Sequence, residues 1–371
     1  MPTYTTRIAA TDEPPLLHQA VDDAVALLRA GEVVALPTET VYGLAADALN
    51  AAAVAKIFEA KERPSFDPLI VHLPHKNMLD TVAEVPADIE PVVKRLVEKF
   101  WPGPLTLLLP KKACVPDLVT AGLPTVAVRV SSNPVFRRVV ATLERPLAAP
   151  SANRFGSISP TSAGAVMSEL EGRIPLILDG GASLHGLEST IVRIEAAQPK
   201  PLITIVRPGP LTPEELKPYG RVQLAPRTIL DDSASDAPGQ LAKHYAPRTP
   251  LRLLTRPSDF HAEEGKRYAL LSLSGEERDG YAGLHDWVEV MMLSPGSGKL
   301  PEAAVRFFHC LRRLDELGVD EIIAEPMHEH GMGIAMMDRL RRASVNKPAP
   351  LRGPAAHHPQ HTQQQQQNRR G

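Results

Sequence analysis

The chain has 371 residues, of which 43% are hydrophobic, and a formal net charge of −2. This length favours two or three domains with ordinary globular cores. The near-neutral charge excludes a global field that would recruit nucleic acid or membrane, although it does not exclude a local basic groove. The two cysteines, Cys114 and Cys310, match no metal or redox spacing and are interpreted as core thiols in a reducing compartment.

No targeting or membrane segment is predicted. Residues 1–10 lack the apolar run of a signal peptide. No apolar stretch approaches the roughly 20 residues that span a bilayer. We therefore expect a cytoplasmic protein with no membrane contact.

Strands alternate with helices over the first half of the chain, which is typical of an α/β domain. We expect one large twisted mixed sheet in a domain covering residues 12–210. The predicted helices are 21–30, 51–60, 89–100, 135–143 and 162–170, and the predicted strands are 33–36, 69–73, 105–109, 126–130, 147–149, 176–178, 190–194 and 202–206.

The remainder divides into a linker (211–249), a smaller α/β domain (250–346) and a tail (347–371). The smaller domain is predicted to be doubly wound and Rossmann-like, but it has no Gly-x-Gly-x-x-Gly opening and is not predicted to bind a dinucleotide. Its predicted strands are 251–254, 268–273, 287–293 and 321–324, and its helices are 301–317 and 334–344. The Gln- and His-rich tail is expected to be disordered.

The segment 36–73 predicts a polyanion pocket at a sheet edge. A buried strand runs into a loop with the hydroxyls of Thr38, Thr40 and Tyr42. Two cations, Lys61 and Arg63, follow a helix, and an Arg fork beside a Lys point charge suits phosphate oxygens. The alternative is an exposed helix end whose cations face the negative end of the dipole.

Other polar residues follow predicted strands, where ligands of α/β sheets gather. Arg129 lies in an apolar strand and must pair either with a substrate carboxylate or with a structural acid. Ser151 and Asn153 form either a site or an ordinary turn, and Ser189 and Arg207 are weaker signals. No phosphate-binding P-loop, serine elbow or covalent nucleophile is evident.

Taken together, these strings resemble the threonylcarbamoyl-AMP synthase family, which combines a YrdC-like domain with a C-terminal domain. The resemblance covers about residues 15–345. It rests on Pro37-Thr-Glu-Thr-Val-Tyr-Gly-Leu44, Lys61-x-Arg63-Pro, Pro68-Leu-Ile-Val-His72, Trp101-Pro-Gly-Pro-Leu-Thr106, Thr125-Val-Ala-Val-Arg129, Pro150-Ser-Ala-Asn153, Glu188-Ser-Thr190, Arg207-Pro-Gly209 and Lys243-His-Tyr-Ala-Pro247.

The resemblance implies that L-threonine, bicarbonate and ATP, the last with Mg²⁺ on its phosphates, give threonylcarbamoyl-AMP and pyrophosphate. The product would feed the modification of adenosine 37 in tRNAs that read ANN codons, through a downstream threonylcarbamoyl transferase. By analogy, threonine is held by Thr40, His72, Arg129 and Ser189. The ATP side would be lined by Lys61, Arg63, Asp67, Thr125, Ser151, Asn153, Ser159 and Arg207, with His244 or Tyr245 closing over it. Lys61 and Arg63 would act electrostatically, and no protein ligand is assigned to the metal.

Two departures and two rival functions accompany this resemblance. Ala237 stands where the family more often has Ser, and Asp67 where it often has Asn. One rival is a non-catalytic module that binds double-stranded RNA or tRNA. The other is carbamoyl transfer, which is disfavoured because the paired cysteines of such enzymes are missing. The oligomeric state is left open.

Overall fold

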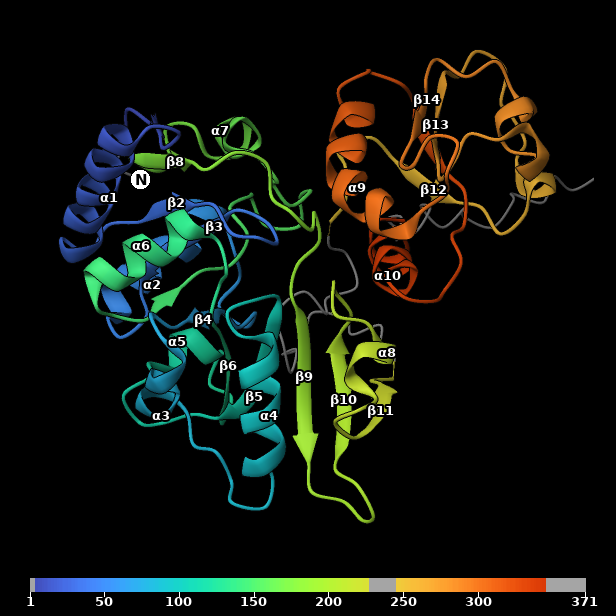
Figure 1. Cartoon of the computed structure of the whole chain (residues 1–371). Coiled ribbons are helices and arrows are strands. Elements are labelled where there is room, and N and C mark those ends of the chain that lie inside the picture. Colours follow the sequence, from blue (N-terminus) through green and yellow to red (C-terminus); the bar gives the residue numbers. More distant parts are fainter. Residues whose placement is uncertain (1–3, 227–244, 345–371) are drawn as a thin grey trace, which may run out of the picture.

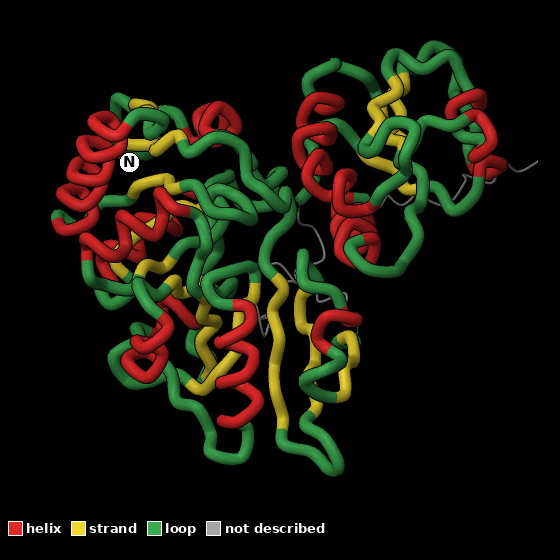
Figure 2. Tube along the Cα trace, in the orientation of Figure 1, coloured by secondary structure: helices red, strands yellow, loops and turns green. Residues whose placement is uncertain are grey.

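The computed structural model describes residues 4–226 and 245–344. Within them, the chain forms an 11-stranded mixed sheet and a separate four-stranded sheet (Figures 1 and 2). The α/β prediction and the large mixed sheet are therefore confirmed. His244, Ala237 and the predicted disordered tail lie outside the described residues.

The large sheet has the strand order β1-β8-β2-β3-β7-β4-β6-β5-β9-β10-β11. Its strands are β1 (Arg7–Ala10), β2 (Val34–Leu36), β3 (Gly43–Asp47), β4 (Ile70–His72), β5 (Leu105–Pro110), β6 (Thr125–Arg129), β7 (Leu147–Ala148), β8 (Leu176–Asp179), β9 (Thr190–Glu195), β10 (Leu202–Arg207) and β11 (Arg221–Leu224). The helices of this part are α1 (Pro14–Arg29), α2 (Ala51–Lys61), α3 (Leu79–Val82), α4 (Glu90–Phe100), α5 (Asp117–Thr120), α6 (Pro134–Leu143), α7 (Ala163–Leu170) and α8 (Pro213–Leu216).

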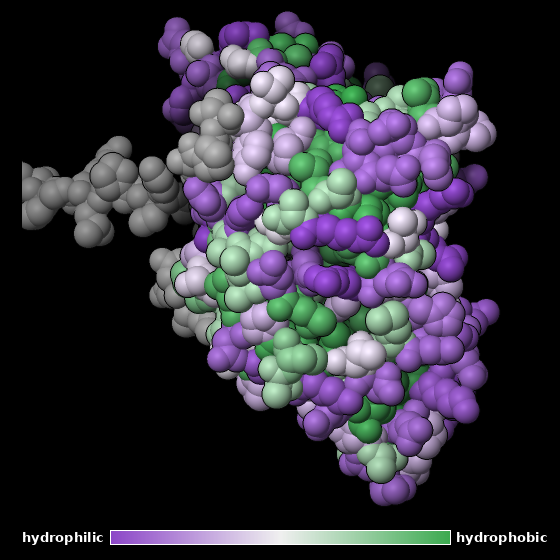
Figure 3. Space-filling view, turned by 90° about the vertical axis from the view of Figure 1, so that its left-hand side faces the viewer, coloured by the Kyte–Doolittle hydropathy of each residue, from purple (hydrophilic) through white to green (hydrophobic). Residues whose placement is uncertain are grey.

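Helices cover both faces of the large sheet, and the alternation of side chains along its strands assigns the faces. In β2, Val34 and Leu36 pack with α1 and α6, whereas Ala35 belongs to the core formed with α2 and α4. Hydrophilic residues dominate the face turned to the viewer in Figure 3, with hydrophobic residues in scattered groups between them. In the described residues, no helix is long and apolar enough to cross a membrane.

The smaller sheet has the order β12-β15-β13-β14, and every adjacent pair in it is parallel. The elements of this domain are β12 (Leu251–Leu253), β13 (Tyr268–Ser272), β14 (Val290–Met292), β15 (Glu321–Ala324), α9 (Leu300–Asp315) and α10 (Gly333–Ala343). The all-parallel sheet, in which α9 connects β14 to β15, confirms the predicted second α/β domain. The predicted strand 287–293 is shorter, because only Val290–Met292 pairs with β13.

Two predictions about the bounds of the large sheet are wrong. The sheet does not end near residue 210, because β11 pairs in parallel with β10. The turn that allows this begins at α8, where Thr212 and Glu215 form a reciprocal capping box, so part of the expected linker is folded. The sheet also begins before residue 12, because β1 pairs with β8.

Gly43 begins β3 and does not have a positive φ. A Cβ at this position would stand 3.2 Å from the Cβ of Ala149 and 3.5 Å from the carbonyl oxygen of Pro150. The limited space beside the 149–150 segment therefore favours glycine.

Candidate active site

A pocket lies where strand-end loops of the large sheet converge, and it collects most of the residues singled out in the sequence. Its lining residues come from the N-terminal domain and, in the case of Tyr245, from the predicted linker: Thr38, Thr40, Val41, Gly43, Arg63, Ile70, His72, Arg129, Ala149, Pro150, Ser151, Glu188, Ser189, Arg207 and Tyr245. Eight of them were predicted as site residues, namely Thr40, Arg63, His72, Arg129, Ser151, Ser189, Arg207 and Tyr245. The predicted convergence of polar strand ends is therefore present in the structure.

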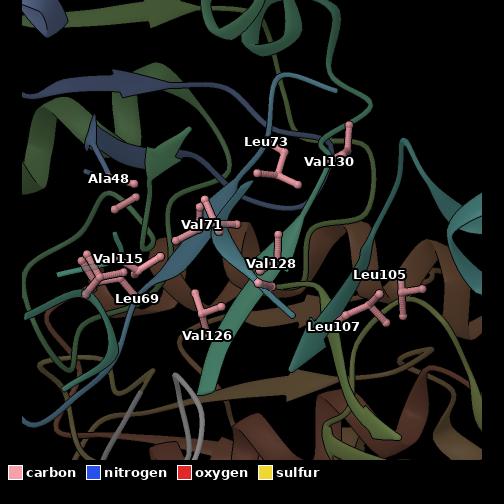
Figure 4. Packing of buried hydrophobic residues seen from close by; sticks show 14 of the residues in the cluster. Ala48, Leu69, Val71, Leu73, Leu105, Leu107, Val115, Val126, Val128 and Val130 are labelled. Carbon is pink, nitrogen blue, oxygen red and sulfur yellow. The ribbon is translucent and has the colours of Figure 1, made fainter. Parts of the chain in front are cut away.

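Strand alternation explains why these side chains face the pocket. One face of β4, β5 and β6 carries the apolar residues seen in Figure 4, including Leu69, Val71, Val126, Val128 and Leu107. The residues between them must point to the opposite face. His72 and Arg129 stand there, directly paired across the parallel β4–β6 ladder. On this face the His72 ring contacts Phe136 of α6, with ring centroids 4.8 Å apart.

Arg129 and its partners form one wall of the pocket. Its Nη1 donates to the hydroxyl of Thr40 at 3.0 Å, and its Nη2 forms a buried ion pair with Glu39. Ser131 donates to the same carboxylate. Of the two alternatives left open for Arg129, the structure shows the structural acid, and that acid is a glutamate from the pocket loop.

Two polar atoms of this wall have no hydrogen-bond partner among the described residues. They are Nε of Arg129 and Nδ1 of His72, and both are buried. Burial, reinforced by the Arg129 cation, holds the pKa of His72 well below its usual range. A neutral imidazole and an uncommitted guanidinium N–H are groups that a small polar ligand can satisfy.

Lys61 is the last residue of α2 and Arg63 follows two residues later, but their side chains have different environments. Helix α2 ends where Glu62 adopts a left-handed conformation with φ of 53°. Arg63 lines the pocket and forms an ion pair with Asp67 at 2.9 Å. Its Nη2 also donates to the carbonyl oxygen of Pro68 at 2.9 Å.

Lys61 is not among the residues that line the pocket, in contrast to the expectation that it lines the ATP side. Its side chain is 1% exposed, and its Nζ donates to the carbonyl oxygens of Ser151 and Asn153. Burial is the main reason that the pKa of Lys61 lies well below its usual range. The alternative of an exposed helix end is also wrong, and Lys61 acts by positioning the loop that carries Ser151.

Ser189 and Arg207 form a second wall. Arg207 donates through Nη2 to the carbonyl oxygen of Ser189 at 2.9 Å and to its hydroxyl at 3.0 Å. The Ser189 hydroxyl also lies 2.7 Å from that of Thr106. Tyr245 comes from the predicted linker; it is buried, its φ is 63°, and its ring stacks on Phe308 of the C-terminal domain.

Four further predicted residues stand behind the lining or away from it. Asp67 is buried against Arg63, and Ser159 donates to Glu188. Asn153 is buried, and its amide donates to two neighbouring carbonyls. Thr125 begins β6, at the end of the strand remote from Arg129, and is partly exposed.

Three residues of importance here were not predicted. Glu39 lies inside the string 37–44, and Glu188 lies beside Ser189, so proximity to the motifs was the available signal. No sequence signal marked Arg339. It belongs to α10 and pairs with Glu188 from 151 positions away.

Buried guanidinium groups line this pocket, and among the described residues no group of three or more His, Cys, Asp or Glu side chains could hold a metal ion. Such a pocket is typical of proteins that bind small anionic ligands. Two family models match the chain. The Sua5–YciO–YrdC model, described as "Telomere recombination", matches residues 26–209, and the model described as "Threonylcarbamoyl-AMP synthase, C-terminal domain" matches residues 211–345.

The threonylcarbamoyl-AMP synthase of Pyrococcus abyssi is 40% identical over 335 residues, which cover 86% of this chain and 93% of that protein. The enzyme of the same name from Bacillus subtilis is 39% identical over 350 residues, covering 91% and 96%. A crystal structure of P. abyssi Sua5 complexed with L-threonine matches with a TM-score of 0.79 and 38% identity, covering 91% of this chain and 97% of that one. The chain therefore belongs to the threonylcarbamoyl-AMP synthase family.

Proposed function

We propose that the chain condenses L-threonine, bicarbonate and ATP to L-threonylcarbamoyladenylate and pyrophosphate. The observation that carries this proposal is that Arg129, Thr40 and His72 line the same pocket as two further guanidinium groups, those of Arg63 and Arg207. We assign the first group to the amino acid and the two further guanidinium groups to phosphates. The two-domain relatives carry the name of this activity, and the P. abyssi structure is complexed with L-threonine.

The chemistry requires no enzyme nucleophile. The amine of threonine captures carbon dioxide as a carbamate, and a carbamate oxygen then attacks the α-phosphorus of ATP. A new oxygen–phosphorus bond forms, the α–β bridging bond breaks, and pyrophosphate leaves with the electron pair. The protein contributes orientation and fixed positive donors to this displacement.

On the threonine side, Arg129 is proposed to bind the carboxylate through the N–H that protein partners leave unused. Thr40 and Ser189 offer hydroxyls, and neutral His72 offers an imidazole nitrogen to the amino or hydroxyl group. A neutral His72 is important because an imidazolium would repel the ammonium form of the incoming amino acid.

On the ATP side, Arg63, Ser151, Arg207 and Tyr245 line the proposed nucleotide site. We assign supporting positions to Lys61, Asp67, Asn153 and Ser159, which are buried behind these residues. Thr125 and His244 remain proposed contacts on the strength of the family strings alone. No residue of the ATP side is placed to act as a nucleophile in this scheme.

Magnesium is proposed to arrive with ATP. Among the described residues, no group of three or more His, Cys, Asp or Glu side chains could hold a metal ion. The carboxylates at the pocket, Glu39, Asp67 and Glu188, each form an ion pair with an arginine. The phosphates and water would therefore supply the ligands, and the ion would neutralise charge on the triphosphate.

The product is a mixed anhydride that a downstream transferase must consume, and we propose the threonylcarbamoyl modification of tRNA in the cytoplasm as its use. Direct contact with tRNA or double-stranded RNA is a second proposal. A non-catalytic RNA-binding module is the main alternative to the synthase. The two functions differ in whether the protein forms an adenylate.

The test measures pyrophosphate release from ATP with and without threonine and bicarbonate. The proposal expects release only when both are present, together with an adenylate that carries the mass of threonine and carbon dioxide. Release that is independent of threonine would overturn the amino-acid assignment. RNA binding by a protein that forms no adenylate would favour the alternative.

A further inference from the structure

Arg339 connects the C-terminal domain to the pocket of the N-terminal domain. Its side chain is 0% exposed, and it belongs to α10, the last helix of the C-terminal domain (Figure 1). Nε and Nη2 donate to Oε2 of Glu188 at 3.2 and 3.0 Å, and Nη1 donates to the carbonyl oxygen of Pro208 at 2.5 Å. All three donations reach segments of the N-terminal domain.

These two acceptors flank the residues of one pocket wall. Glu188 directly precedes Ser189, and Pro208 directly follows Arg207. The two segments are already in backbone contact, since a Cβ at Gly209 would lie 2.4 Å from the carbonyl oxygen of Glu188. Arg339 therefore binds the residue before Ser189 and the residue after Arg207, and Ser189 and Arg207 form the hydrogen bonds of the wall.

The same guanidinium also contacts the residue that enters from the linker. The Arg339 carbon Cζ lies 5.2 Å from the ring centroid of Tyr245, within the range of a cation–π interaction. Behind this ring, Val41 and Leu187 of the N-terminal domain share a hydrophobic core with Phe308 of the C-terminal domain. The two domains are thus packed together around the wall that contains Ser189.

An ion pair that only tethered two domains could lie anywhere on their interface. This one ends on Glu188, an acid that lines the pocket itself. A carboxylate there without its cation would repel the triphosphate and the carbamate, and would also be costly to bury. Arg339 thereby supplies both a fixed geometry and a neutralising charge.

We propose that Arg339 is a positioning residue through which the C-terminal domain holds the Ser189–Arg207 wall and neutralises Glu188, so that the pocket can take anionic substrates. This inference rests on the proposed function for its substrates. It goes beyond that function because it assigns a specific role in the site to the C-terminal domain.

The first test compares Arg339→Met with Arg341→Met in the full-length chain. Arg341 lies on the same helix and forms a surface ion pair with Glu329, so its replacement controls for loss of a cation from α10. We expect Arg339→Met to raise KM for ATP at least about tenfold, and Arg341→Met to leave it unchanged. An Arg339→Met variant with altered kcat but the KM of the wild type would overturn the proposal, because a purely structural role lowers only the active fraction.

A companion variant isolates the charge. Glu188→Gln in the Arg339→Met background removes the uncompensated carboxylate, so KM for ATP should return most of the way to that of the Glu188→Gln single variant. Absence of any recovery would show that neutralisation of Glu188 is not the function of Arg339.

The last measurement does not depend on turnover or on the stability of the methionine variant. Arg339→Lys retains the charge with fewer donors, and we expect faster backbone hydrogen exchange at 186–190 and 207–211 than in the wild type. Unchanged exchange in both segments would show that Arg339 does not position the Ser189–Arg207 wall. If the wild type releases no threonine-dependent pyrophosphate, the proposed function fails, whereas hydrogen exchange still decides the role of Arg339.

Discussion

Replacing Arg63 by methionine should affect stability and activity through separate interactions. The Arg63 guanidinium donates to the carbonyl oxygens of Asp67 at 3.2 Å and Pro68 at 2.9 Å, and it pairs with the Asp67 carboxylate at 2.9 Å. The side chains of Arg63 and Asp67 are 4% and 0% exposed, respectively. Removing one partner of a buried ion pair costs about 3–5 kcal/mol. We therefore expect Arg63→Met to lower the free energy of unfolding by about that amount.

The double variant Arg63→Met with Asp67→Asn should recover most of this stability, because no buried carboxylate is left without its cation. Activity should not recover, because Arg63 lines the pocket and methionine provides no donor. Loss of one charged donor to the phosphates corresponds to about 2–4 kcal/mol in kcat/KM.

The assay combines urea unfolding with threonine-dependent pyrophosphate release for the wild type, both single variants and the double variant. Asp67→Asn is the matched control, since it removes the pair but keeps the guanidinium. A double variant with the kcat/KM of the wild type would refute the phosphate-binding role of Arg63. A double variant no more stable than Arg63→Met would refute the account of the ion pair.

Three further predictions follow from the site. Serine should be a weak substrate and valine essentially none, because a site built for a hydroxyl leaves its own polar groups unpaired with the analogue that lacks it; efficient turnover of valine would contradict this. Because His72 has a lowered pKa in the folded state, the unfolded chain takes up its proton first as pH falls below about 6.5. The wild type should then lose up to about 1.4 kcal/mol of stability per pH unit relative to His72→Asn, and parallel curves in urea unfolding would disprove the assignment. A chain ending at Pro226 keeps β11 but lacks Tyr245 and Arg339, and its pyrophosphate release should fall at least about tenfold; activity equal to that of the full chain would show that the C-terminal domain is dispensable for the site.

Much of the pocket was predictable because its residues follow strands that the sequence marks clearly. The apolar runs around Val71 and Val128 fix two strands, and their alternation places His72 and Arg129 on one face. A parallel ladder then brings these two side chains together without further information. The threonine side of the site depends on this kind of local pattern.

The predictions failed where a residue's partner is distant in sequence. Lys61 appeared exposed because a helix end normally is, but the loop at Ser151 folds over it. Strand β11 has only four residues and lies mostly exposed at the edge of the sheet, so no buried apolar run marks it in the sequence. Arg339 is one of several arginines on α10, and only the tertiary structure distinguishes its burial against Glu188 from the surface pair of Arg341.

The arrangement of acids and bases also explains how a chain with a net charge of −2 can bind an anionic nucleotide. Two guanidinium groups at the pocket, those of Arg63 and Arg129, are each fixed by a buried carboxylate. Such pairing removes most of the long-range field but leaves N–H donors in set orientations. Binding then depends on donor geometry more than on net charge, and little side-chain entropy is lost when the ligand arrives. The same reasoning accounts for Glu188 at the pocket wall, because a cation from the other domain is buried against it.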